Sequence, residues 1–95
     1  MTSINYEALN KAYRKQKAAL TRAKNSNDPL KVLAAVESAV KDFNAYGWPD
    51  QWATWRIALN EAYWDFSHSD ACDDDCYDNG GRVIRRFEAC GDSFA

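Results

Sequence analysis

Long apolar runs are absent from this sequence. No stretch approaches the roughly 20 apolar residues that a membrane-spanning helix needs, and the opening MTSINYEALNKAYRK lacks the run of about seven that a secretory signal needs. We therefore expect a protein that stays in the cytosol and does not associate with membranes.

Histidine and glycine are also scarce, with one His and four Gly in 95 residues. There is no Gly-rich phosphate loop and no Gly-x-Ser-x-Gly turn, so no nucleophile has a partner that the sequence identifies. Internal repeats and low-complexity linkers are absent too. The sequence predicts a single domain over residues 1–95, without catalytic residues or a cofactor, and we expect that it is not an enzyme.

The three cysteines, an odd number, cannot all pair within a monomer and suit a reducing compartment. His68, Cys72 and Cys76 are spaced four residues apart, and Cys90 could add a fourth ligand to a tetrahedral zinc site. This spacing is unlike the paired knuckles of structural zinc sites, and an intracellular Cys is more often a small buried hydrophobe. We therefore predict inert thiols and no bound metal.

Charge is distributed unevenly along the chain. Residues 1–31 hold seven bases and two acids, which is +5, whereas residues 32–95 hold five bases and twelve acids, which is −7. The small net charge of −2 thus conceals a basic end and an acidic end.

Apolar residues recur at three- and four-residue steps, which predicts an all-α fold. We expect a three-helix bundle with a short C-terminal fourth helix. Trp55 and Leu59 should be almost fully buried, and Phe94 should anchor the tail. The four helices are expected from Asn5 to about Lys24, from Asp28-Pro29 to a left-handed cap at Gly47, from Pro49 to about Phe66, and from the glycines at 80–81 to Gly91.

The junction between the second and third helices carries a motif. It begins Gly47-Trp48-Pro49-Asp50-Gln51-Trp52, and Trp55 and Ala58-Leu59 follow at helical spacing. This segment resembles small accessory proteins of actinobacteriophages, which carry a Trp-Pro-Asp-x-Trp-x-x-Trp-x-x-Ala-Leu motif after a helix that begins near an Asp-Pro. The resemblance covers residues 28–63. It implies a phage origin and the cytoplasm of a host cell, and it transfers no catalytic residues.

The leading functional hypothesis is a helical protein-interaction module, a phage-encoded accessory or host-modulating protein that binds a host protein. Trp48 lies in the predicted turn and is the Trp least required in the core. An acidic segment with five Asp could meet a basic partner, whether that segment is helix or loop. The predicted partner-binding residues are Trp48, Asp70, Asp73, Asp74, Asp75 and Asp78.

The alternative hypothesis is a nucleic-acid-binding protein that uses the first helix. In a helix-turn-helix protein the helix after the tight turn enters the major groove. Here that helix should expose no basic face but the acidic and neutral polar residues Asp50, Gln51, Thr54, Asn60 and Glu61. Any contact with phosphates would therefore come from the first helix alone. Its basic residues are Lys11, Arg14, Lys15, Lys17, Arg22 and Lys24. The oligomeric state is left open.

Overall fold

A computed structural model describes residues 6–47, 52–69 and 77–94 of the protein, with the backbone alone for residues 77–80. All regular structure in these ranges is helical, which confirms the all-α class. The elements are α1 (Tyr6–Asn25), α2 (Pro29–Tyr46), α3 (Trp52–Ser67) and α4 (Tyr77–Ser93). The predicted helix starts at Asn5 and Pro49 lie outside the described residues. Among the described helices, none has the length and apolar character needed to cross a membrane.

Both ends of α2 follow from local chemistry. Asp28 is the N-cap, and its side chain accepts a hydrogen bond from the Leu30 N–H at 3.0 Å, while Pro29 occupies a first-turn position that needs no donor. At the other end the Gly47 N–H donates to the Phe43 carbonyl at 2.7 Å. Gly47 has φ 118° and ψ 165°, so the predicted helix end is confirmed but the predicted left-handed conformation is wrong. Its backbone occupies an extended region at positive φ that only glycine adopts readily.

The fourth helix is longer than predicted. It spans 17 residues, comparable to the other three, begins before the paired glycines and passes Gly91 to end at Ser93. Its first two residues, Tyr77 and Asp78, bring the end of the acidic segment into a helix.

Packing explains why the glycines do not end α4. Phe87 and Cys90 are buried, and Val83 and Ile84 pack against the same core from one stripe of the helix. Each buried apolar side chain contributes about 1.5–3 kcal/mol, which exceeds the cost of about 1 kcal/mol for a glycine within a helix.

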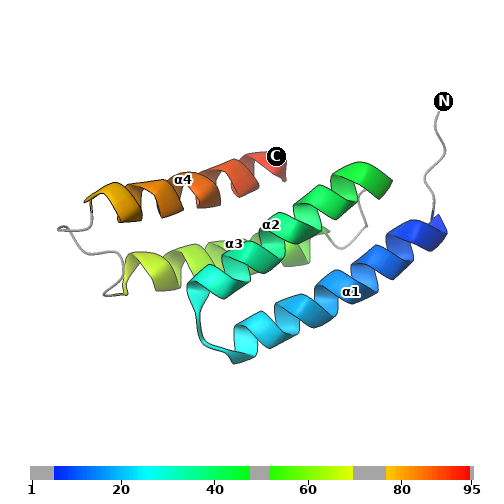
Figure 1. The fold of residues 1–95 in the computed structure, drawn as a ribbon, viewed down its shortest axis with the longest axis horizontal. Helices are drawn as coiled ribbons and strands as arrows, with labels where there is room; N and C mark the ends of the chain where they lie inside the picture. The colour runs from blue at the N-terminus through cyan, green and yellow to red at the C-terminus, as the bar shows by residue number, and fades with distance from the viewer. Residues whose placement is uncertain (1–5, 48–51, 70–76, 95) are drawn as a thin grey trace.

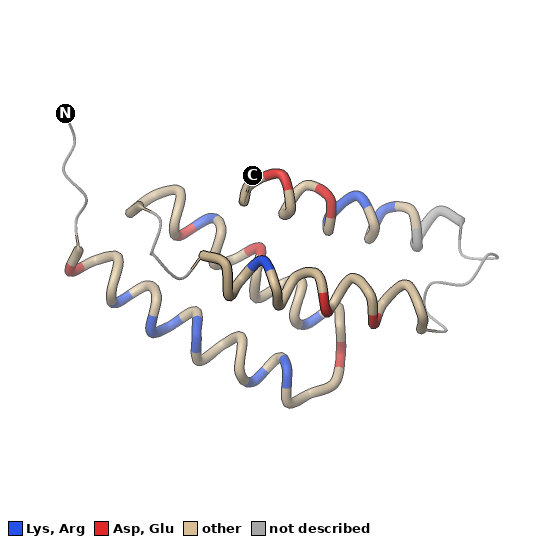
Figure 2. The backbone as a smooth tube through the Cα atoms, turned by 180° about the vertical axis from the view of Figure 1, so that it is seen from behind, with Lys and Arg blue, Asp and Glu red and all other residues tan. Residues whose placement is uncertain are grey.

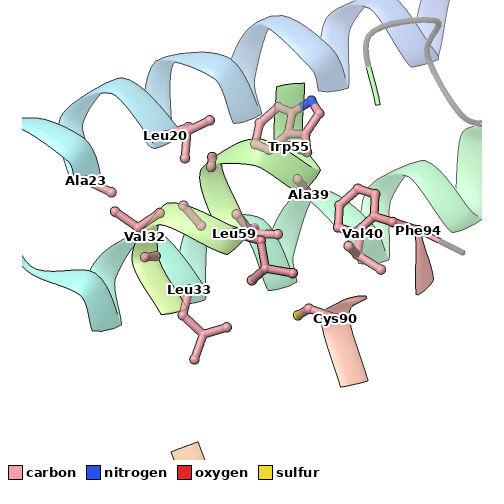
Figure 3. Packing of buried hydrophobic residues seen from close by; sticks show 14 of the residues in the cluster. Leu20, Ala23, Val32, Leu33, Ala39, Val40, Trp55, Leu59, Cys90 and Phe94 are labelled. Carbon is pink, nitrogen blue, oxygen red and sulfur yellow. The ribbon is translucent and has the colours of Figure 1, made fainter. Parts of the chain in front are cut away.

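The helix α2 lies at the centre of the molecule. It packs against each of the other helices, and α1 and α4 lie along its opposite edges while α3 lies behind it (Figure 1). The core is one continuous cluster to which all four helices contribute (Figure 3). Its large members include Leu9, Leu20, Leu33, Val36, Phe43, Trp55, Leu59, Phe66, Phe87 and Phe94.

Aromatic rings occupy the middle of this core. Trp55 is 1% exposed and makes edge-to-face contacts with Phe43 and Tyr13, at 5.5 and 6.4 Å between ring centroids. Leu59 is also buried, so both predicted core positions are confirmed. Phe94 is buried as well, which confirms the predicted tail anchor.

One buried polar group ties α1 to α2. The Gln16 side-chain amide donates to the Asp42 carboxylate at 2.7 Å and to the Ser38 hydroxyl at 3.2 Å. An exposed ion pair between Arg86 and Glu37 similarly joins α4 to α2. The side-chain hydrogen bond to Glu37 raises the pKa of Arg86, so this guanidinium stays charged.

Candidate interaction surfaces

The outward side of α3 exposes large apolar side chains. Ile57 is 58% exposed and Trp64 is 62% exposed. The two are seven residues apart, which places them two helical turns from each other on the same side. Ala53, Asn60 and Glu61, all exposed, lie along the same side. We call this surface, made of Ala53, Ile57, Asn60, Glu61 and Trp64, the α3 face.

The Trp64 ring is held in place across the end of α3. It stacks on His68 with 3.8 Å between ring centroids, and His68 Nδ1 lies 3.0 Å from the Ser67 hydroxyl. The Ser67 hydroxyl in turn donates to the Trp64 carbonyl at 2.9 Å. A stacked ring loses less conformational freedom on binding than a free one, so this Trp is partly preorganised for contact.

The sequence interpretation missed this surface. Thr54, Asn60 and Glu61 are exposed as predicted, and Asp50 and Gln51 lie outside the described residues. Ile57 and Trp64 are exposed on the same helix. The signal was present in the spacing, because at 100° per residue both positions fall roughly opposite the buried Trp55. Counting apolar residues on every side of the helix, rather than on the best stripe alone, would have shown that α3 has a second apolar side.

A basic surface runs along α1. All six predicted basic residues are exposed, and Figure 2 shows them spread over the length of the helix. No ion pair within the described residues involves any of the six. Lys17 lies over the Tyr13 ring, with Nζ 5.9 Å from its centroid, and Lys24 lies toward α3. Of the remaining four, Lys11, Arg14 and Arg22 fall opposite the buried stripe of α1 and Lys15 lies at its flank; we call these four the α1 basic face.

A hollow of about 300 Å³ lies between the α1–α2 turn and α3. Its floor includes Val32 and Ala58, and its charged members are Lys24 and three acids. The three acids are Asp28, Glu61 and Asp65. The α1 side of the α3 face is therefore bordered by more negative than positive charge.

The candidate metal ligands are not grouped in the described residues. Cys90 lies in the core, where burial first and the charge of Glu37 second raise the pKa of its thiol to about 11. A thiol held neutral in this way is a poor nucleophile and a poor metal ligand. His68 is exposed and stacks on Trp64, while Cys72 and Cys76 lie outside the described residues. No group of three His, Cys, Asp or Glu side chains in the described part of the chain could hold a metal ion.

The predicted partner-binding residues fall largely beyond the described ranges. Trp48, Asp70, Asp73, Asp74 and Asp75 lie outside them, and Asp78 is described through its backbone alone, in the first turn of α4. These predictions stay open. Among the described residues, four of the seven large hydrophobic side chains that are exposed lie on α3, namely Trp52, Ile57, Tyr63 and Trp64.

No model of a known protein family, no curated protein and no solved structure matches this chain. The α3 face and the α1 basic face are therefore the features from which a function can be inferred.

Proposed function

We propose that this protein is a helical interaction module that binds another protein through the α3 face. The observation that carries the proposal is the exposure of Trp64 and Ile57 on the same side of one helix, two turns apart. Single exposed hydrophobics are ordinary on protein surfaces, but an exposed Trp that shares a helix face with a second large apolar side chain is typical of an interface. Covering such a ring contributes on the order of 2 kcal/mol or more to binding.

The rest of the molecule supports this role as a scaffold. In the proposal α1 and α2 pack with α3 as a three-helix bundle that holds the α3 face rigid, with Trp55 anchoring α3 from its buried side. Trp48 precedes α3 in the chain and the acidic residues 70–78 follow it. We include these flanking residues as additional partner contacts, which would favour a partner with basic residues around an apolar centre.

The resemblance of residues 28–63 to actinobacteriophage accessory proteins supports the biological setting. We propose a phage-encoded protein that acts in the host cytoplasm by occupying a surface of a host protein. No catalytic step is part of this function, and no cofactor is required.

The test is affinity capture from a nuclease-treated actinobacterial lysate, followed by binding measurements with each purified captured protein. Trp64→Ala should abolish capture and weaken binding by about tenfold or more, because the ring forms the centre of the α3 face. Tyr6→Ala is the matched control, since it removes a 66% exposed aromatic side chain from α1. Capture that survives Trp64→Ala and Ile57→Ala would rule out the α3 face as the binding surface.

Nucleic-acid binding through α1 is a second candidate, favoured by one observation. The α1 basic face carries four exposed bases without an ion pair in the described residues. The logarithm of the association constant for a labelled DNA duplex should then fall linearly with the logarithm of the salt concentration. The double variant Lys11→Glu/Lys15→Glu should reduce the magnitude of this slope by about two. Lys41→Glu, on the exposed side of α2, is the control. An unchanged slope in the α1 variant would exclude this candidate.

A further inference from the structure

The α3 face carries the spacing of a coiled-coil seam. Ala53, Ile57, Asn60 and Trp64 follow one another at steps of four, three and four residues, which is the a/d pattern of a heptad repeat. Ile57 and Trp64 take the a positions, and Ala53 and Asn60 take the d positions. All four are exposed, so this seam is unpartnered within the described residues.

Opposite charges flank the seam. Glu61 borders the side toward α1, where it lines a hollow together with Lys24. Arg56 falls on the other flank, the side on which Asn60 and Tyr63 line a second hollow with Phe87 and Glu88 of α4. In heptad terms Arg56 is at g and Glu61 is at the following e, five residues later. Both side chains are exposed.

We propose that the α3 face binds a second copy of this chain, in a parallel two-fold pair of α3 helices. The proposal rests on the proposed function, because it uses the same α3 face: a weak dimer leaves that face available on dilution, and a host protein would displace the second copy from it. In a parallel pair each g residue faces the e residue five positions later in the other helix. Arg56 of each copy therefore meets Glu61 of the partner subunit, and the two-fold axis makes this ion pair twice.

The opposite orientation is electrostatically unfavourable. An antiparallel pair brings the same flank of both copies together, so Glu61 would approach Glu61 of the partner subunit. It would also bring the two α1 helices, with their exposed bases, to the same side of the interface. The parallel pair instead places α1 of one copy beside α4 of the other. Charge thus selects the orientation, while Ile57 and Trp64 supply the apolar contact.

The position of α3 allows this pairing. Seen from behind, α3 lies in front of the other helices, with α1 and α4 to either side (Figure 2). Two copies can therefore meet along α3. The seam has four a/d positions over 12 residues, from Ala53 to Trp64 of the 16-residue α3. A contact this short should bury less surface than a standard interface, so the dimer should dissociate on dilution.

Sedimentation velocity of the full chain from about 5 to about 500 μM tests the association. We expect a monomer–dimer equilibrium whose dissociation constant rises by about tenfold or more in Trp64→Ala. Tyr6→Ala should leave it unchanged. A monomer at every concentration, or a dimer that Trp64→Ala leaves intact, would overturn the proposal.

Charge reversal tests the ion pairs. Arg56→Glu alone places two acids opposite each other, and Glu61→Arg alone places two bases opposite each other, so each should weaken the dimer by about tenfold. The double variant Arg56→Glu/Glu61→Arg restores opposite charges in both pairs and should regain most of the affinity. A double variant no better than the single ones would refute the parallel arrangement.

Orientation is tested by cross-linking. In a parallel pair Ala53 lies opposite Ala53 of the partner subunit, so Ala53→Cys should form a disulfide-linked dimer under mild oxidation. Peptide mapping, with the parent chain as control, identifies the link. A dimer without a 53–53 link would indicate another orientation and overturn the proposal. If the chain stays monomeric but a captured host protein still requires Trp64, the proposed function stands and the self-association fails. If Trp64→Ala changes neither association nor capture, both fail.

Discussion

Trp55 is the residue on which the core depends most. Its ring is 1% exposed, and its indole Nε1–H has no hydrogen-bond partner among the described residues, so its contribution is almost wholly apolar. We expect Trp55→Ala to lower the free energy of unfolding by about 3–5 kcal/mol, enough to unfold a domain of this size. Trp55→Phe keeps an aromatic ring and removes the unpaired donor, so it should cost clearly less. Urea unfolding followed by circular dichroism measures both, and equal losses would contradict this account.

Cys90 should behave as a protected thiol. With its pKa raised to about 11, it remains protonated in the folded protein at pH 8, and alkylation should be much slower than in urea. Because the folded-state pKa is raised, its contribution to stability is complete below about pH 9 and is lost as the pH rises toward 11. Mass spectrometry of the Cys90 peptide measures alkylation, and Cys90→Ala is the control for the pH dependence. Rapid alkylation of the folded protein would show that the thiol is accessible.

At the scale of single residues, the sequence predicts burial where one stripe dominates a helix. Trp55 and Leu59 satisfy the helical period together with other apolar residues, so their burial could be predicted. The exposure of Ile57 and Trp64 could not be predicted in the same way. The helical spacing of apolar residues shows that α3 has two apolar sides, but it does not show which side meets the core. Only the packing of α2 against α3 decides this.

Among the helix ends, Gly47 is the most constrained. Its φ of 118° with ψ of 165° lies in a region that β-branched residues avoid strongly. We expect Gly47→Val to cost about 1–3 kcal/mol and to lower the melting temperature by several degrees. Thermal unfolding of the parent and the variant measures this. An unchanged melting temperature would mean that α2 ends differently in solution.

Substitution of Gly81 should raise the stability of the protein, whereas substitution of Gly47 should lower it. It lies inside α4 without a positive φ, and a Cβ built on it meets no atom within 4 Å. Gly81→Ala should therefore stabilise the protein by about 0.5–1 kcal/mol, since alanine lowers the entropy lost on forming the helix. The same thermal measurement applies. A loss of stability would argue that residue 81 is not helical.

At the scale of elements, helix starts and ends were predictable where a cap makes a specific hydrogen bond. Asp28-Pro29 and Gly47 are examples. The start of α4 was not predictable, because the glycines at 80–81 indicate a break by local propensity. The buried stripe from Val83 to Cys90 outweighs that propensity, and its burial depends on α2 and α3 rather than on local sequence.

For the whole molecule, the continuous core predicts cooperative unfolding. Phe87 connects α4 to α3 through Tyr63 and Phe66, with ring centroids 5.4 and 5.9 Å apart, and the same cluster continues through α2 to Leu9 of α1. Phe87→Ala should cost about 3–5 kcal/mol. Because all four helices share this cluster, Phe87→Ala should lower the midpoint of a single unfolding transition of the whole protein rather than allow α4 to unfold separately.

Two probes distinguish these outcomes. Circular dichroism reports all helices, whereas fluorescence reports mainly α3, which holds Trp52, Trp55 and Trp64. Coincident urea midpoints in the parent and in Phe87→Ala would establish a single cooperative unit. If Phe87→Ala instead lost part of its helical signal before fluorescence changed, α4 would be an independent element. The α3 face would then rest on a scaffold of α1 and α2 alone, and its rigidity would depend on Trp55 and Phe43 rather than on contacts with α4.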